Sequence, residues 1–96
     1  MYVFEADISE ADYPRMRALI PELPASYVGF CSERERRHRR RAKAGVTIRR
    51  ERVIPDFFAQ YARARKIASP TWDGLDVAAM LQWRSEHPIH HRTSAA

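Results

Sequence analysis

Two stretches of the chain alternate apolar and polar residues in the manner of half-buried strands. Residues 2–8 read YVFEADI, with apolar side chains at the even positions and with Glu5 and Asp7 at odd positions. This period-two pattern predicts a strand with one face toward the core, and we expect Glu5 and Asp7 to face water. Residues 46–54 are rich in β-branched side chains and predict a second strand. Two of its arginines share the parity of its apolar positions, so we expect either a bulge there or an edge strand guarded by charges.

The segment between these strands predicts two helices. Residues 9–12 have the capping-box pattern SEAD, which opens a short helix that stops at Pro21. A longer helix begins near residue 25 or 26 and ends at Gly45, because glycine readily adopts the conformation that follows a helix. Its first half has an apolar stripe, and its second half has no apolar residue before Ala42. We therefore expect this helix to start on the core and to project a basic end into solvent.

Two further helices follow the second strand. The third opens at Pro55 and the fourth at Ser69–Pro70, since proline suits the first turn of a helix. The resulting order, β-α-α-β-α-α, predicts a small α+β domain with a two-stranded sheet packed by helices and one long Arg-rich helix projecting from the core. We expect residues 1–88 to form this single domain and residues 89–96 to form a flexible tail.

The charge of the chain is concentrated in the predicted long helix and the second strand. Residues 32–41 read SERERRHRRR, a run without one apolar side chain. Residues 33–52 hold ten Lys and Arg against three Glu, a net of +7, while the whole chain is +5, so the remaining residues sum to −2. We expect such a run to face water or an acidic partner. One strongly charged region on a nearly neutral domain is typical of proteins that bind a polyanion or an acidic protein surface.

The candidate binding residues are the cations of this region. They are Arg34, Arg36, Arg37, Arg39, Arg40, Arg41, Lys43, Arg49, Arg50 and Arg52. On a helix they divide between two faces, one with positions 36, 40 and 43 and another with positions 34, 37 and 41. Guanidinium groups bind phosphate in a bidentate manner, and such binding weakens steeply with salt. Residues 32–41 contain no aromatic side chain to stack on bases and no Asn or Gln to read adenine, which predicts binding with little sequence discrimination.

Three interpretations fit this pattern. The first is a non-enzymatic module that contacts the phosphate backbone of nucleic acid, or a nucleoprotein complex, through the Arg-rich helix and the adjoining strand. The second is a protein-interaction factor, such as an inhibitor or adaptor encoded by a phage or mobile element, that docks the same cations on an acidic protein surface. It requires an apolar anchor beside the cations, for example an exposed Tyr61 or Trp83. The third is a solvated helix end without a partner.

Enzymatic and metal chemistry find little support in the sequence. His87, His90 and His91 lie close together, but structural zinc needs four ligands, usually including Cys, and Cys31 stands alone. Asp56 suits the first turn of a helix better than a nuclease site. The sequence shows neither a glycine-rich phosphate loop nor a serine with a nearby histidine as base. We expect a protein that is not an enzyme and that holds no metal or cofactor.

The expected location is the cytoplasm. A single cysteine excludes an internal disulfide. The amino-terminal residues have neither the basic nor the apolar region of a signal peptide. No apolar run approaches the roughly 20 residues that span a bilayer, so we expect no membrane contact.

Overall fold

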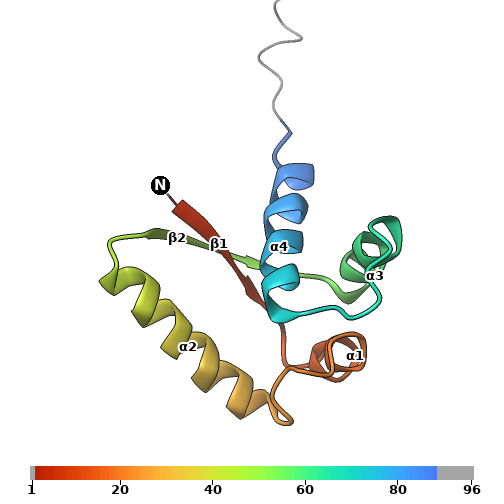
Figure 1. Cartoon of the computed structure of the whole chain (residues 1–96), viewed down its shortest axis with the longest axis horizontal. Coiled ribbons are helices and arrows are strands. Elements are labelled where there is room, and N and C mark those ends of the chain that lie inside the picture. Colours follow the sequence, from red (N-terminus) through yellow and green to blue (C-terminus); the bar gives the residue numbers. More distant parts are fainter. Residues whose placement is uncertain (1, 89–96) are drawn as a thin grey trace, which may run out of the picture.

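The computed structural model describes residues 2–88, which form four helices and a two-stranded sheet in an α+β arrangement (Figure 1). The order β-α-α-β-α-α confirms the predicted one. The elements are β1 (Tyr2–Asp7), α1 (Tyr13–Leu19), α2 (Tyr27–Lys43), β2 (Thr47–Arg52), α3 (Pro55–Ala64) and α4 (Trp72–Glu86). The predicted tail, residues 89–96, lies outside the described residues.

The sheet consists of β1 and β2 paired in parallel. Glu5 lies opposite Arg50, and Asp7 lies opposite Arg52. The register is continuous along both strands, so the two arginines of β2 mark a charged edge strand and not a bulge. Parallel strands need a long crossover connection, which α1 and α2 provide here.

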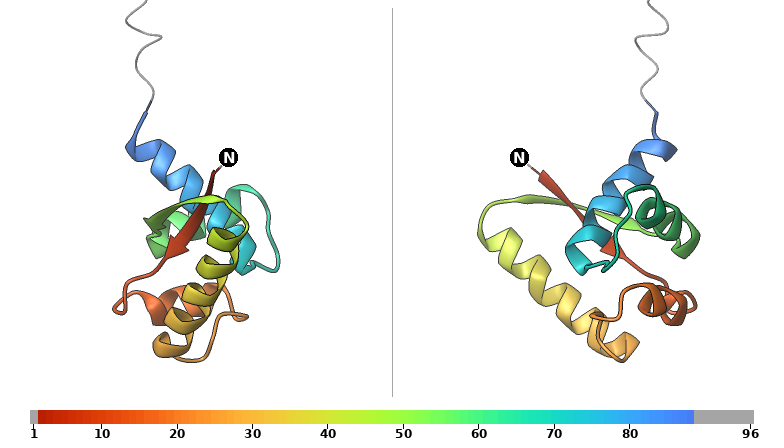
Figure 2. Two further views of the ribbon diagram at one scale, coloured as in Figure 1. Left: turned by 90° about the vertical axis from the view of Figure 1, so that its left-hand side faces the viewer. Right: turned by 45° about the vertical axis from the view of Figure 1, so that its right-hand side comes forward.

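The two faces of the sheet have different coverings. Phe4 and Ala6 of β1 and Ile8, just after the strand, pack in the hydrophobic core, where Ala6 and Ile8 are fully buried. The core also contains Tyr13, Met16, Ile20, Leu23, Phe30, Val53, Phe58, Trp72, Leu75, Ala78 and Ala79. Figures 1 and 2 show α4 beside the strands on one side and α2 on the other. The two acids at odd positions of β1, Glu5 and Asp7, contact α2.

The Arg-rich helix α2 is continuous through its arginine run and is fixed at both ends. The side chain of Ser26 accepts a hydrogen bond from the backbone N–H of Gly29 at 3.0 Å, which caps the first turn. Near the N-terminal end, the buried ring of Phe30 stacks on Trp72 with centroids 5.2 Å apart. After the helix, Gly45 has a φ of 80°, a left-handed conformation that glycine adopts without strain. The predicted start and end of this helix are confirmed.

Two other helices begin later than the sequence predicts. In α4 the cap is Thr71 and not Ser69, because the Thr71 hydroxyl accepts the backbone N–H of Gly74 at 3.0 Å. Before α1, the Ser9 hydroxyl accepts the N–H of Asp12 at 3.1 Å, as a capping box requires. That hydrogen bond stabilises a turn, and α1 itself starts after this turn, at Tyr13.

Candidate functional site

The basic region divides into two sets of side chains, one turned toward the sheet and one turned toward solvent. The division follows the two helical faces expected from the sequence. The sheet-facing set is held by three acids, Glu5 and Asp7 of β1 and Asp76 of α4. Glu5 and Asp7 were expected to face water, but Glu5 is only 3% exposed and the side chain of Asp7 is only 14% exposed. The expectation was wrong because α2 covers the part of β1 that carries these acids.

Glu5 lies at the centre of the sheet-facing set. Its carboxylate lies 3.0 Å from Nδ1 of His38 and 3.2 Å from Nη1 of Arg41, both on α2. It also lies 3.3 Å from Nη2 of Arg50, its cross-strand neighbour on β2. Arg50 reaches a second acid, Glu35 of α2, at 3.2 Å. A buried carboxylate is costly unless it is paired, and these contacts supply its partners.

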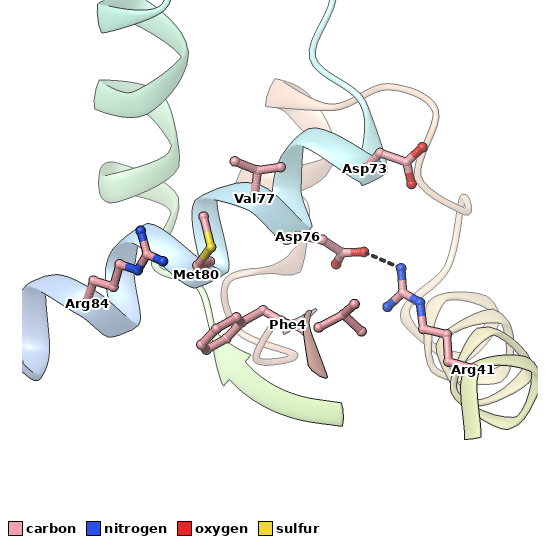
Figure 3. Close-up of a pocket in the computed structure, with 8 residues that line it drawn as sticks. Phe4, Arg41, Asp73, Asp76, Val77, Met80 and Arg84 are labelled. Carbon is pink, nitrogen blue, oxygen red and sulfur yellow. Dashed lines mark hydrogen bonds and ion pairs between the residues drawn. The ribbon is translucent and has the colours of Figure 1, made fainter. Parts of the chain in front are cut away.

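Asp76 connects α4 to both β1 and α2. Its Oδ1 accepts the backbone N–H of Ala6 at 2.8 Å. Its Oδ2 lies 3.2 Å from Nη2 of Arg37 and 3.1 Å from Nη2 of Arg41. Figure 3 shows the Asp76 side chain directed at Arg41. Burial raises the pKa of Asp76, while the Ala6 N–H and the two arginines act in the opposite direction. The arginine side of α2 is thus anchored to the N-terminal half of α4.

The remaining sheet-facing contacts involve Asp7 and two aromatic rings. Asp7 pairs with Arg34 of α2 and, at 3.1 Å, with Arg52 of β2. The guanidinium of Arg37 lies 4.5 Å from the centroid of the Trp72 ring, a cation–π distance. The structure therefore places five of the ten predicted binding residues in ion pairs with Glu5, Asp7 or Asp76. These five are Arg34, Arg37, Arg41, Arg50 and Arg52.

The opposite face of α2 carries the cations that we call the basic stripe, namely Arg36, Arg39, Arg40 and Lys43. All four are exposed. Arg36 pairs with Glu33 on the same helix, and the hydrogen bond from Arg36 lowers the pKa of Glu33. The other three make no ion pair with any acid among residues 2–88. The stripe lines a shallow depression on the surface of α2.

The last predicted cation, Arg49, lies away from the stripe. Its guanidinium is 4.8 Å from the centroid of the Trp83 ring, which also stacks on His87 at 4.3 Å. The guanidinium of Arg65 likewise lies 5.4 Å from the centroid of the Tyr61 ring. Both aromatic rings are half-buried. Neither provides the exposed aromatic anchor that a protein-binding patch was expected to need.

Among residues 3–88 the exposed large apolar residues are three aliphatic side chains, Val28, Ile54 and Val77. Val28 is 78% exposed and precedes the arginine run on α2. Among residues 2–88 no group of His, Cys, Asp and Glu side chains could hold a metal ion. His90 and His91, considered above as ligands, lie outside the described residues.

Comparison with known proteins identifies no relative. No protein-family model, curated protein or solved structure matches the chain. Within residues 2–88, none of the helices has the length and apolar character required to cross a membrane. The geometry of the basic region is therefore the basis of the functional proposal.

Proposed function

We propose that the protein is a non-enzymatic module that binds the phosphate backbone of nucleic acid, alone or in a nucleoprotein complex, through the basic stripe of α2. The observation that carries the proposal is the contrast between the two faces of this helix. The sheet-facing arginines are matched by Glu5, Asp7 and Asp76. Arg39, Arg40 and Lys43 are exposed and make no ion pair within residues 2–88, and like charges so close together repel until a polyanion neutralises them.

The proposed interaction requires phosphate contacts and no base contacts. Arginine forms bidentate hydrogen bonds with phosphate oxygens, and lysine provides a point charge. The stripe has neither an aromatic ring to stack on a base nor an amide side chain to read one. Binding should therefore show little sequence preference and should weaken steeply with salt, as counterion release predicts.

The internal ion pairs support this proposal by fixing the position of the stripe. Arg37 and Arg41 attach α2 to α4 through Asp76, and Arg34 attaches it to β1 through Asp7. The backbone under the stripe is consequently held before any ligand binds. Such preorganisation lowers the entropy cost of binding and favours a rigid array of charges as the partner.

An acidic protein surface is the second candidate partner, and Val28 is the observation that favours it. Val28 lies eleven residues before Arg39, which at 3.6 residues per turn places it about 20° from Arg39 around α2, at the edge of the stripe. Its 78% exposure would let it act as an apolar anchor beside the stripe. Val28→Ser separates the two candidates, because it should leave nucleic-acid affinity unchanged but weaken docking on a protein.

The test of the proposal is fluorescence anisotropy with a labelled, random-sequence nucleic acid at about 50 mM and about 200 mM salt. The stripe variant combines Arg39→Gln, Arg40→Gln and Lys43→Gln. The control variant combines Arg63→Gln, Lys66→Gln and Arg84→Gln, three exposed cations on α3, the segment after it and α4. Both variants lose the same charge, so they differ only in where the charge is lost.

The proposal predicts that the stripe variant binds much more weakly than the wild type and that the control variant binds almost as well. Thermal unfolding of both variants should match that of the wild type, since all six side chains are exposed. Equal losses of affinity in the two variants would show that only net charge matters. No binding by the wild type at the lower salt concentration would reject nucleic acid as the partner.

A further inference from the structure

We infer that the basic stripe binds a duplex, and that it follows the phosphates of one strand without inserting α2 into a groove. This inference rests on the proposed function and specifies its partner. Three features lead to it: the width of the stripe, the acids beside it, and the lack of an exposed aromatic ring among residues 3–88.

The stripe is too narrow for groove insertion. At 3.6 residues per turn, positions 36, 39, 40 and 43 span an arc of about 100° on the helix. A helix inside the major groove meets a phosphate backbone on each flank, so it needs cations on both sides. The flanks of this stripe carry Glu33 on one side and Glu35 on the other. If α2 lay in a groove, the carboxylates of Glu33 and Glu35 would each face a row of phosphates and be repelled by it.

The cations opposite the stripe cannot supply the missing flanks. Arg34, Arg37 and Arg41 are directed at Asp7, Asp76 and Glu5, and β1 and α4 occupy that side of α2. Only one face of the helix is therefore available to a nucleic acid. One face can contact one row of phosphates.

The length of the stripe suits a short segment of a duplex strand. From Arg36 to Lys43 the helix rises about 10 Å. Phosphates of one duplex strand advance about 3.4 Å per base pair along the axis, and they lie farther apart than this along the winding strand. The long side chains at the two ends extend the reach of the stripe, so the four cations can meet about three or four phosphates. A duplex holds its phosphates in a regular, stiff row, which matches cations fixed on a helix that is anchored at Asp76.

A single-stranded nucleic acid would make fewer favourable contacts with this surface than a duplex. Proteins that bind single strands place aromatic side chains where bases can stack on them. Among residues 3–88 the exposed large apolar side chains are Val28, Ile54 and Val77, none of them aromatic. The ring of Trp83 is already in contact with His87 and Arg49. A single strand would gain phosphate contacts alone, at a lower charge density than a duplex.

The experiment compares four labelled ligands of equal length and random sequence: duplex DNA, duplex RNA, and single strands of each. We expect both duplexes to bind within a few-fold of each other, because one row of phosphates is available in either, and to bind about tenfold tighter than the single strands. Against duplex DNA, the logarithm of the affinity should fall with the logarithm of salt concentration with a slope of about −3 to −4. The stripe variant should lose on the order of 100-fold in duplex affinity, as expected for about three lost phosphate contacts near physiological salt.

The outcomes separate this inference from the proposed function. Single strands that bind as tightly as duplexes, with the same loss in the stripe variant, would overturn the duplex assignment and leave nucleic-acid binding through the stripe intact. A slope of about −6 or steeper would overturn the one-row geometry, because it would require phosphate contacts on both flanks. Absence of binding to all four ligands would overturn the proposed function itself.

Discussion

Oδ2 of Asp76 in α4 lies 3.1 Å from Nη2 of Arg41 in α2, and Oδ1 of Asp76 accepts a hydrogen bond from the backbone N–H of Ala6 in β1. One carboxylate therefore ties the basic helix to the helix on the other side of the sheet and to the strand between them. This contact explains how a run of arginines without one apolar side chain can still form part of a packed domain. It also divides the arginines into those that hold α2 in place and those that remain available.

The first prediction concerns Asp76. Asp76→Ala should lower the free energy of unfolding by about 2 kcal/mol, because the backbone N–H of Ala6 loses its acceptor and Arg37 and Arg41 lose their common partner. Asp73→Ala is the matched control, since Asp73 also pairs with Arg37 but its side chain is 90% exposed. It should change stability by less than about 0.5 kcal/mol. Urea denaturation measures both, and equal effects would refute the anchoring role of Asp76.

The second prediction compares the two faces of α2. Arg37→Gln with Arg41→Gln should destabilise the fold by about 2–4 kcal/mol, because the largely buried Asp76 carboxylate loses both of its arginine partners. Arg39→Gln with Arg40→Gln should leave stability within about 0.5 kcal/mol of the wild type, since both side chains are exposed. Thermal melting followed by circular dichroism measures the difference. Identical melting temperatures for the two double variants would mean that the sheet-facing contacts contribute nothing.

The third prediction concerns Glu33, which pairs with Arg36 and lies on one flank of the stripe. Glu33→Gln should raise duplex affinity about fivefold near physiological salt, the amount expected for one additional phosphate contact. Stability should hardly change, because an ion pair between neighbouring turns at the surface contributes little to folding. Anisotropy and melting of the same sample check both parts. Unchanged or weaker duplex binding would mean that Arg36 is not part of the binding surface.

The fourth prediction concerns Glu51 of β2. Burial raises the pKa of Glu51, and its contact with Glu86 raises it further. A carboxyl group whose pKa is higher in the folded than in the unfolded state favours folding below its ordinary pKa of 4.5, and this contribution is lost as the pH rises through the folded value. Glu51→Gln keeps a neutral group beside Gln82, which donates to Glu51 at 2.9 Å. The variant should therefore gain stability over the wild type at about pH 7 and little at about pH 4. A gain that is the same at both pH values would contradict this explanation.

The parts of the fold set by local sequence were predictable. The alternation in residues 2–8 predicts β1, and the ends of α2 follow from Ser26 and Gly45, which act within one turn of the chain. The two faces of the arginine run also follow from helical geometry alone. The start of α4 was misplaced because Thr71 and Ser69 are both good caps, and the sequence does not show which of them forms the hydrogen bond to the first turn.

The role of each face of α2 could not be predicted, because it depends on residues far apart in the chain. Glu5 becomes buried only when β2 pairs in parallel with β1 and α2 covers the part of β1 that carries Glu5 and Asp7. Asp76 was missed, although a signal was present. It lies within the apolar stripe of α4, between Trp72 and Ala79, where an acid needs a buried partner.

The most direct test of the account is to locate the surface that nucleic acid contacts, by recording amide chemical shifts of the labelled protein during titration with a random duplex. We predict that the largest changes fall on residues 36–43 of α2, with α3 and the C-terminal half of α4 unaffected. Changes centred on the groove between β1 and α4, lined by Val3, Val77 and Met80, would contradict the account. A spectrum unaffected by saturating duplex at low salt would contradict it as well.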